Sequence, residues 1–238
     1  MSKFYSEIAK YYDHIFPLSN ATVDLIKESA GDSPKDILDV ACGSGLYSEA
    51  LASAGYRVTA IDLDQQMVGQ LQQRNGMIRA EVLNMLELEK LGQQFDVIFC
   101  IGNSVVHLKD NQEVYDFFTS CHRNLKEQGK LIIQVVNYDR ILDKDVKSLP
   151  TIKNDDIGLV FERNYDYLKE QHKINFNTVL KVDGESLENS VLLHPIRSAE
   201  ILQLLKQAGF SMVEFFGSFK KEQFKLQESA PLIVIASK

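Results

Sequence analysis

Short apolar runs alternate with helix-like segments through the first part of the chain. Segments 3–13 and 18–31 carry apolar residues at helical spacing. From residue 36 onward, continuous apolar runs, which are typical of strands buried on both faces, alternate with further helical segments. The expected strands are 36–40, 57–61, 78–82, 95–101 and 130–136, and the helices between them are 44–54, 65–73 and 111–125. Helical crossovers between buried strands predict an α/β, Rossmann-like, doubly wound and mostly parallel sheet with helices on both faces.

The pattern changes after the fifth expected strand. Between residues 155 and 195 apolar and polar residues alternate, with polar turns at 169–171 and 183–185. A period of two without intervening helices predicts a small antiparallel sheet. A last helix is expected at 198–207, with Ser198 as its N-cap. Two more strands, at 210–217 and 231–236, bring the main sheet to seven strands.

We therefore expect a single domain, residues 1–238, in which an antiparallel insertion lies over one edge of the main sheet. Its expected parts are an N-terminal helical cap at 1–34, a ligand-binding core at 35–137, the antiparallel insertion at 138–196, and the last helix with the final two strands at 197–238.

Composition and charge narrow the class of protein. The chain is 45% hydrophobic and 25% charged, the balance of a globular domain. Lys and Arg number 26 against 33 Asp and Glu, and the absence of a basic stripe argues against nucleic acid as a partner. No apolar run reaches the ~20 residues of a membrane span, and the N-terminus does not resemble a signal peptide. Three cysteines without a CxxC pair argue for reduced thiols and against a zinc site. We therefore expect a cytoplasmic protein without a metal, a membrane or a nucleic acid partner.

The most informative segment is the first expected strand and the turn after it. This strand runs into Asp39, and Gly43 and Gly45 follow before the next helix. Glycines at such a turn let the backbone approach a ligand, and the helix N-terminus offers free N–H donors. Asp62 ends the next strand, where a carboxylate can accept both hydrogen bonds of a ribose diol. A dinucleotide motif would have a third glycine where this chain has Ser48. Asp39 instead suits a ligand that carries an ammonium group.

Four motifs together resemble those of the class I S-adenosylmethionine-dependent methyltransferases. They are Asp39–Gly45 (DVACGSG), Ile61–Asp62, Leu83–Met85 and Phe95–Ile101 (FDVIFCI). The resemblance covers nearly the whole chain. Within this superfamily, Cys100–Leu108 and Asn137–Leu142 are similar to the glycine N-methyltransferase branch.

The resemblance implies S-adenosylmethionine as the cofactor and S-adenosylhomocysteine as its product. Asn84 stands where the family commonly has Asp, and its side-chain oxygen can still accept a hydrogen bond from the adenine amine. No tryptophan is present to stack on adenine, so methionine and aliphatic side chains would enclose the base. The implied cofactor-binding residues are Asp39, Ala41, Gly43, Gly45, Asp62, Leu63, Met67, Asn84, Met85 and Ile101.

On the acceptor side, the resemblance implies catalytic roles for Asn103, His107 and Tyr12. The first two follow the fourth strand at the carboxyl edge of the sheet, where ligands of such folds bind. Tyr12 lies on an N-terminal helix that closes over the sulfonium in many family members. The branch has an arginine that binds the carboxylate of the acceptor, and Arg163 and Arg197 are candidates for it by rough location only. His194 is a further candidate site residue.

The implied reaction is transfer of a methyl group to a small polar metabolite, with nitrogen preferred to oxygen, by in-line displacement in a capped site. Three other interpretations stay open: an O-methyltransferase of a small acid or phenol, a non-catalytic S-adenosylmethionine-binding protein, and a flavin or nicotinamide oxidoreductase. The Asn/Asp-Pro-Pro-aromatic motif of base-methylating enzymes is absent, since Asn103 is followed by Ser-Val. The sequence specifies neither the acceptor nor whether the chain is a monomer or a homo-oligomer.

Overall fold

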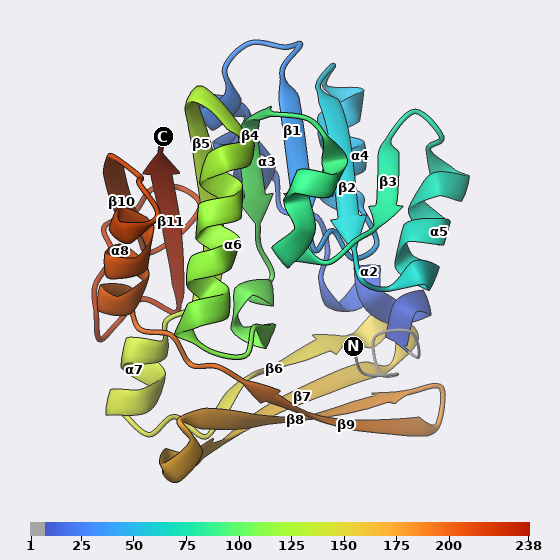
Figure 1. Ribbon diagram of the computed structural model, residues 1–238. Coiled ribbons are helices and arrows are strands. Elements are labelled where there is room, and N and C mark those ends of the chain that lie inside the picture. The colour runs from blue at the N-terminus through green and yellow to red at the C-terminus, as the bar shows by residue number, and fades with distance from the viewer. Residues whose placement is uncertain (1–7) are drawn as a thin grey trace.

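A seven-stranded sheet forms the central layer of the molecule (Figure 1). The computed structural model describes residues 8–238. The strands of this sheet are β1 (Asp36–Val40), β2 (Arg57–Asp62), β3 (Arg79–Val82), β4 (Phe95–Cys100), β5 (Leu125–Val136), β10 (Met212–Phe216) and β11 (Pro231–Ser237). Their spatial order is β10-β11-β5-β4-β1-β2-β3. All pairs among β1 to β5 are parallel, and β11 is antiparallel to both its neighbours. The predicted Rossmann-like, mostly parallel fold is confirmed, with a mixed sheet.

Helices cover both faces of this sheet because successive strand residues point to opposite sides. Ile37 of β1 packs into one apolar cluster, whereas its neighbour Leu38 packs into another. The first cluster includes α3 (Asn20–Ala30), α4 (Leu46–Ser53) and α5 (Gln65–Arg74), and the second includes the 3₁₀ helix η2 (Met85–Leu91), α6 (Asn111–Asn124) and α8 (Ser198–Gln207). None of the described helices is both long and apolar enough to cross a membrane.

A second sheet, which we call the cap sheet, lies across the carboxyl ends of the parallel strands (Figure 1). It is antiparallel and contains β6 (Ser148–Asn154), β7 (Leu159–Leu168), β8 (Lys173–Val182) and β9 (Glu185–Leu193), in that order. This agrees with the predicted antiparallel insertion. The N-terminal helices η1 (Ala9–Tyr11) and α2 (Tyr12–Ile15) pack on the cap sheet, since Tyr11 and Ile15 join a buried cluster with Phe161 and Leu180. Four further short helices complete the chain: η3 (Ser104–His107), α7 (Tyr138–Asp143), η4 (Asp155–Ile157) and η5 (Lys169–Gln171).

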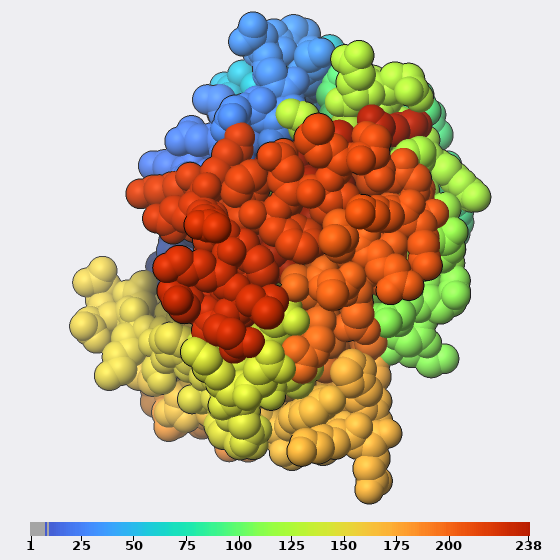
Figure 2. All heavy atoms as spheres, turned by 90° about the vertical axis from the view of Figure 1, so that its left-hand side faces the viewer, coloured from blue at the N-terminus to red at the C-terminus, as the bar shows by residue number. Residues whose placement is uncertain are grey.

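The segment between β10 and β11 closes one side of the space between the two sheets. Figure 2 shows it in red, next to the yellow-green residues that follow β5. Asn137 is fully buried there, and its amide nitrogen donates to the carbonyl oxygens of Leu226 and Ser229, each at 2.9 Å. A buried side chain after β5 therefore fixes the end of the segment between β10 and β11.

β6 and α7 are among the elements that were not predicted from the sequence. β6 is an edge strand that contains Pro150 and mostly polar residues, so it lacks the apolar alternation of its neighbours. α7 is a short helix that begins after Asn137, whose side-chain oxygen accepts from the Arg140 N–H at 3.3 Å. The domain boundaries at residues 34, 137 and 196 stay a prediction.

Two of the predictions concern where helices begin. The prediction of Ser198 as the N-cap of α8 was wrong, because Arg197 occupies that position. The Glu200 carboxylate accepts from the Arg197 N–H at 2.9 Å, and the Ser198 N–H instead donates to Asp139 at 2.9 Å. Of the helix expected at 3–13, the part before Ile8 lies outside the described residues.

Candidate functional site

Two adjoining cavities lie between the carboxyl ends of the main strands and the cap sheet. The first cavity has a volume of about 400 Å³ and is lined by Asp39, by the ends of β4 and β5, and by β7 and β8 of the cap. The second has a volume of about 350 Å³ and is lined by residues that follow β2 and β3 and by β9. Tyr12, Ala41, Gly102 and His107 line both cavities. A ligand that fills both cavities would therefore pass these four residues.

The turn after β1 has a backbone that requires its glycines. Gly45 has a φ of +82°, and a Cβ there would lie 2.6 Å from Leu71. Gly43 has a φ of +54°, and a Cβ there would lie 3.2 Å from the Tyr12 ring. Ala41 also has a positive φ, of 58°, which is uncommon for a residue with a side chain. The turn thus brings the backbone directly beneath Tyr12 at the wall shared by the two cavities.

Asp39 is a buried carboxylate at the wall of the first cavity. Its described side-chain partner is the Ser48 hydroxyl, which donates to it at 2.6 Å. Burial, and to a lesser extent the charge of Asp62, raises the pKa of Asp39 to about 7. A cationic ligand group beside it would stabilise the carboxylate form, so this site suits an ammonium group.

Asp62 is held by the backbone on both sides. Its two carboxylate oxygens accept from the Gly43 N–H and the Asp64 N–H, each at 2.9 Å. Burial raises its pKa, and these hydrogen bonds oppose that effect. Since each oxygen keeps a second acceptor position, the carboxylate can still bind a diol in the second cavity. Asp64 in turn caps α5 by accepting from Gln66 and Met67.

The remaining predicted cofactor residues divide between the two cavities. Leu63, Met67, Asn84 and Met85 line the second cavity with Asp62, whereas Ile101 lines the first. The Asn84 oxygen accepts from the Leu86 N–H at 3.0 Å, because Asn84 caps η2. This oxygen keeps a second acceptor position, so the contact of Asn84 with the adenine amine stays a prediction.

The three predicted catalytic residues meet at the first cavity. Asn103 has a φ of 68°, and its side chain donates to the Tyr138 hydroxyl at 3.0 Å and accepts from the Val136 N–H at 2.9 Å. These contacts make Asn103 a link between the ends of β4 and β5. His107 and Tyr12 lie at the shared wall, and poor solvation of its charge lowers the pKa of His107.

Of the three weaker candidates, the structure places one at the first cavity and two outside both cavities. Arg163 lines the first cavity. Arg197 instead forms ion pairs with Asp139 at 3.3 Å and Asp143 at 2.8 Å, and the His194 ring is hydrogen-bonded to Asn111 at 2.7 Å. Neither Arg197 nor His194 lines either cavity.

Some lining residues were not singled out from the sequence. Gly102 donates its N–H to the Gln134 side chain at 2.7 Å, and both residues line the first cavity. On the cap, Phe161, Tyr165 and Phe176 line the same cavity. Alternation identified these residues as one face of a sheet, but it could not show that this face covers a cavity. Among the described residues, no cluster of three or more His, Cys, Asp or Glu side chains could hold a metal ion.

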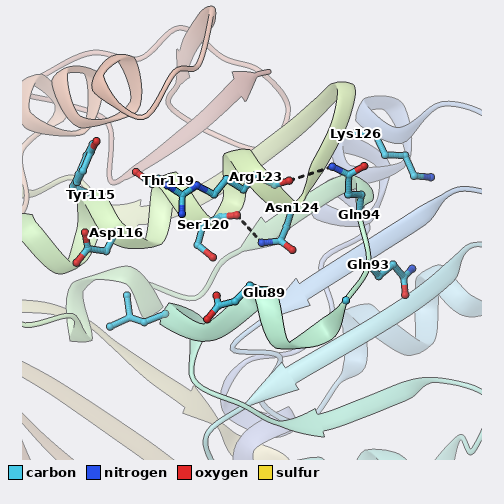
Figure 3. Close-up of a pocket in the computed structure, with 12 residues that line it drawn as sticks. Glu89, Gln93, Gln94, Tyr115, Asp116, Thr119, Ser120, Arg123, Asn124 and Lys126 are labelled. Carbon is cyan, nitrogen blue, oxygen red and sulfur yellow. Dashed lines mark hydrogen bonds between the residues drawn. The ribbon is translucent and has the colours of Figure 1, made fainter.

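A larger surface depression, of about 1010 Å³, lies between η2 and α6 (Figure 3). It contains none of the predicted catalytic or cofactor-binding residues. Two of its amide side chains are paired locally: Asn124 donates to the Ser120 carbonyl at 2.8 Å and Gln94 donates to the Arg123 carbonyl at 3.2 Å. The two cavities under the cap, although smaller, are the candidate site.

The comparison of the sequence with known proteins points to one activity. Residues 37–129, from β1 to the start of β5, match the family model described as "Methyltransferase domain". The chain is 27% identical over 191 residues to the glycine/sarcosine N-methyltransferase of Halorhodospira halochloris, covering 77% of this chain and 68% of that protein. It is also 27% identical to the putative methyltransferase YqeM of Bacillus subtilis, covering 96% and 99%. The ubiquinone biosynthesis O-methyltransferase of Pseudomonas syringae is 33% identical over 120 residues, which cover 48% of this chain and 50% of that protein.

Solved structures show the same fold over the whole chain. An S-adenosylmethionine-dependent methyltransferase from Clostridium acetobutylicum superposes with a TM-score of 0.82 at 17% identity, covering 99% of each chain. CalS10 from Micromonospora echinaspora, an amino pentose methyltransferase with S-adenosylmethionine bound, superposes with a TM-score of 0.73 at 16% identity, covering 100% of this chain and 97% of that one. Together, the matched domain, the related sequences and the shared fold support an S-adenosylmethionine-dependent methyltransferase.

Proposed function

We propose that this enzyme methylates a small polar acceptor on nitrogen, with the cofactor lying across both cavities and the acceptor under the cap. The observation that carries the proposal is the wall shared by the cavities. One cavity has the groups expected around adenosine, the other has a buried carboxylate and the cap, and Tyr12 and His107 lie where they meet.

The residues present fit S-adenosylmethionine. Asp39 would pair with the ammonium group of its methionine part, since this buried carboxylate has a hydroxyl but no described cation beside it. Asp62 would accept from the ribose hydroxyls, and Asn84 would contact adenine. The remaining contacts would come from the backbone of Ala41 and Gly43 and from the side chains of Leu63, Met67, Met85 and Ile101. Gly45 lines neither cavity and would act by shaping the turn against Leu71.

The bound cofactor supplies a methyl group on a sulfonium, and its departure needs no proton. The protein must therefore hold the acceptor in line and exclude water. His107 is the group that can accept the proton that an ammonium acceptor must lose before its nitrogen attacks, because its lowered pKa keeps the imidazole neutral at pH 7. Tyr12 covers the turn at Gly43 from the N-terminal side. Asn103 acts through the backbone, because its contacts fix the ends of β4 and β5.

Nitrogen is preferred to oxygen because of where the relatives align. The glycine/sarcosine N-methyltransferase of Halorhodospira halochloris aligns over 77% of this chain, so the likeness extends beyond the matched domain. The ubiquinone biosynthesis O-methyltransferase aligns over only 48% of it. Acceptor binding depends on the cap, so the longer alignment is the more informative one. O-methylation of a small acid or phenol is the second candidate.

Mass spectrometry of a mixed acceptor panel tests this proposal. Purified enzyme with S-adenosylmethionine is incubated with small amines, amino acids, carboxylic acids and phenols, and each product is examined for one added methyl group. We expect methylated amines. A clear preference for phenols or carboxylic acids would replace the proposal with O-methylation, and activity confined to protein or RNA would contradict a small acceptor. His107→Gln should lower turnover without lowering cofactor affinity.

A further inference from the structure

Among the described residues, two amide side chains line the first cavity, and they differ in how they are paired. Both ends of the Asn103 amide are engaged, by the Tyr138 hydroxyl and the Val136 N–H. The Gln134 oxygen accepts from the Gly102 N–H at 2.7 Å, but no described residue accepts from the Gln134 amide nitrogen. A backbone N–H can only donate, so this contact fixes which end of the Gln134 amide is the oxygen. Gln134 therefore keeps two N–H donors at the wall of the first cavity.

Gln134 and Asp39 stand on the same face of the main sheet. Ile37, Phe99 and Ile132 belong to the apolar cluster that includes α3, α4 and α5. Asp39 comes two residues after Ile37 and Gln134 comes two residues after Ile132, so both side chains point to the face of that cluster. Asp39 is in register with Phe99 on β4, and Phe99 with Ile132 on β5. Gln134 thus lies two strands across from Asp39 and two residues further along.

The gap between Asp39 and Gln134 suits a small polar group of a ligand. At about 4.8 Å between strands and about 3.3 Å per residue, their Cα atoms lie about 12 Å apart, which leaves room for such a group between the two side chains. Ile101, which follows β4 between them, lines the first cavity with an apolar side chain. A ligand in this gap meets a carboxylate at one end and two N–H donors at the other. An α-amino acid group, with an ammonium and a carboxylate on one carbon, matches both ends.

We propose that Gln134 binds the carboxylate of S-adenosylmethionine through its amide nitrogen, while Asp39 pairs with the ammonium group. This contact rests on the proposed function, which places the methionine part of the cofactor in the first cavity. Of the described residues that line this cavity, the one lysine or arginine is Arg163, and it belongs to the cap. The core therefore offers a neutral donor, which costs less to leave without a ligand than a poorly solvated cation does.

Calorimetric titration of the purified enzyme tests this contact without turnover, at about pH 8 so that Asp39 is ionised. The probes are S-adenosylhomocysteine, its analogue without the carboxylate, and methylthioadenosine, which has neither the carboxylate nor the ammonium group. We expect S-adenosylhomocysteine to bind about ten- to a hundredfold more tightly than the analogue without the carboxylate. Equal affinity for these two ligands would overturn the proposal.

Variants assign the preference for a carboxylate to the Gln134 amide nitrogen. Gln134→Glu keeps an oxygen that can accept from Gly102 and replaces both donors by a second oxygen, whereas Gln134→Leu removes both ends of the amide. Both variants should bind the analogue without the carboxylate at least as tightly as S-adenosylhomocysteine. Gln112→Leu, which removes an exposed side chain of α6 that donates to Asp116, should keep the preference.

The same titrations contain the results that would contradict the assignment. Retention of the preference in Gln134→Glu would show that the donors are not needed. Loss of the preference in Arg163→Met, with none in the Gln134 variants, would assign the carboxylate to the cap. Affinity for methylthioadenosine reports whether each variant is folded. If Gln134→Glu does not fold, the result for Gln134→Leu decides.

The Gln134 contact and the proposed function can fail separately. If methylthioadenosine binds as tightly as S-adenosylhomocysteine, the amino acid end adds no affinity and the proposed placement of the cofactor is wrong. If S-adenosylhomocysteine is preferred to both other ligands and the Gln134 variants keep that preference, the placement stands and the Gln134 contact is wrong.

Discussion

The core side and the cap side of the two cavities differ in how completely their polar groups are paired. On the core side, both oxygens of Asp62 accept backbone hydrogen bonds, Asp39 accepts from Ser48, and both ends of the Asn103 amide are engaged. On the cap side, Arg163 Nε and the Thr178 hydroxyl are buried without partners. These polar groups of the core side are thus paired within the protein, whereas two on the cap side are not. If the proposed function holds, the cofactor site is built into the fold and the acceptor is selected by the cap.

Replacement of Asp62 should produce the largest of the expected effects, and it should change only the affinity for the cofactor. Asp62→Ala removes an acceptor for ribose and frees two backbone N–H groups. Hydrogen bonds to a charged group contribute about 1.5–3 kcal/mol, so we expect about a hundredfold loss of affinity for S-adenosylhomocysteine in a calorimetric titration. Asp145→Ala, in an exposed turn, is the matched control. Unchanged affinity in Asp62→Ala would show that the core wall is not the cofactor site.

Asn103→Ala should separate turnover from cofactor binding. The substitution removes the contacts with Tyr138 and Val136, which fix the ends of β4 and β5 beside His107. We expect kcat/KM to fall about tenfold or more while cofactor affinity changes less than about threefold. Steady-state kinetics and calorimetry on the same preparation check this. Equal losses in both quantities would place Asn103 with the cofactor instead of the acceptor.

Asp39 should make cofactor affinity depend on pH. Burial raises its pKa to about 7, and only the carboxylate form can pair with an ammonium group. Affinity for S-adenosylhomocysteine should therefore rise about tenfold per unit as the pH increases toward 7, and then level off. The stability of the free enzyme should depend on pH in the opposite direction. The native state keeps a proton that the unfolded state loses above about pH 4, so this group lowers the free energy of unfolding as the pH rises to 7. Asp39→Asn should remove the dependence in both measurements.

The smallest effects should come from removing two buried hydroxyls, and they should be seen in the free energy of unfolding. Ser48→Ala removes the partner of Asp39 and should lower the free energy of unfolding by about 1 kcal/mol. Thr178→Val removes a buried hydroxyl that has no partner, so it should leave the free energy of unfolding unchanged or raise it by up to about 1 kcal/mol. Chemical denaturation without ligand measures both. A substantial loss in Thr178→Val would mean that the cap wall is also satisfied by the protein.

The sequence by itself determined the main sheet and the cofactor side of the site. Continuous apolar runs mark strands buried on both faces, and the turn at Gly43 and Gly45 with Asp62 on the next strand is a local pattern at short spacing. Gly45 shows why this sequence pattern indicates the turn. Its φ of +82° and the closeness of the Leu71 side chain leave no room for a Cβ. The constraints on these residues come from their own backbone conformation or from neighbouring strands, so they are visible in the local sequence.

The acceptor side was decided only by the tertiary structure. Alternation placed Arg163 and Phe161 on one face of a strand, but not above Asp39, because the distance between the sheets depends on how the cap packs. The sequence likewise could not show that Arg197 is paired with Asp139 and Asp143 while Arg163 is left unpaired. Whether a charge is free or satisfied depends on contacts between segments far apart in the chain. For this protein those contacts separate an arginine held in ion pairs from one that has no described carboxylate partner.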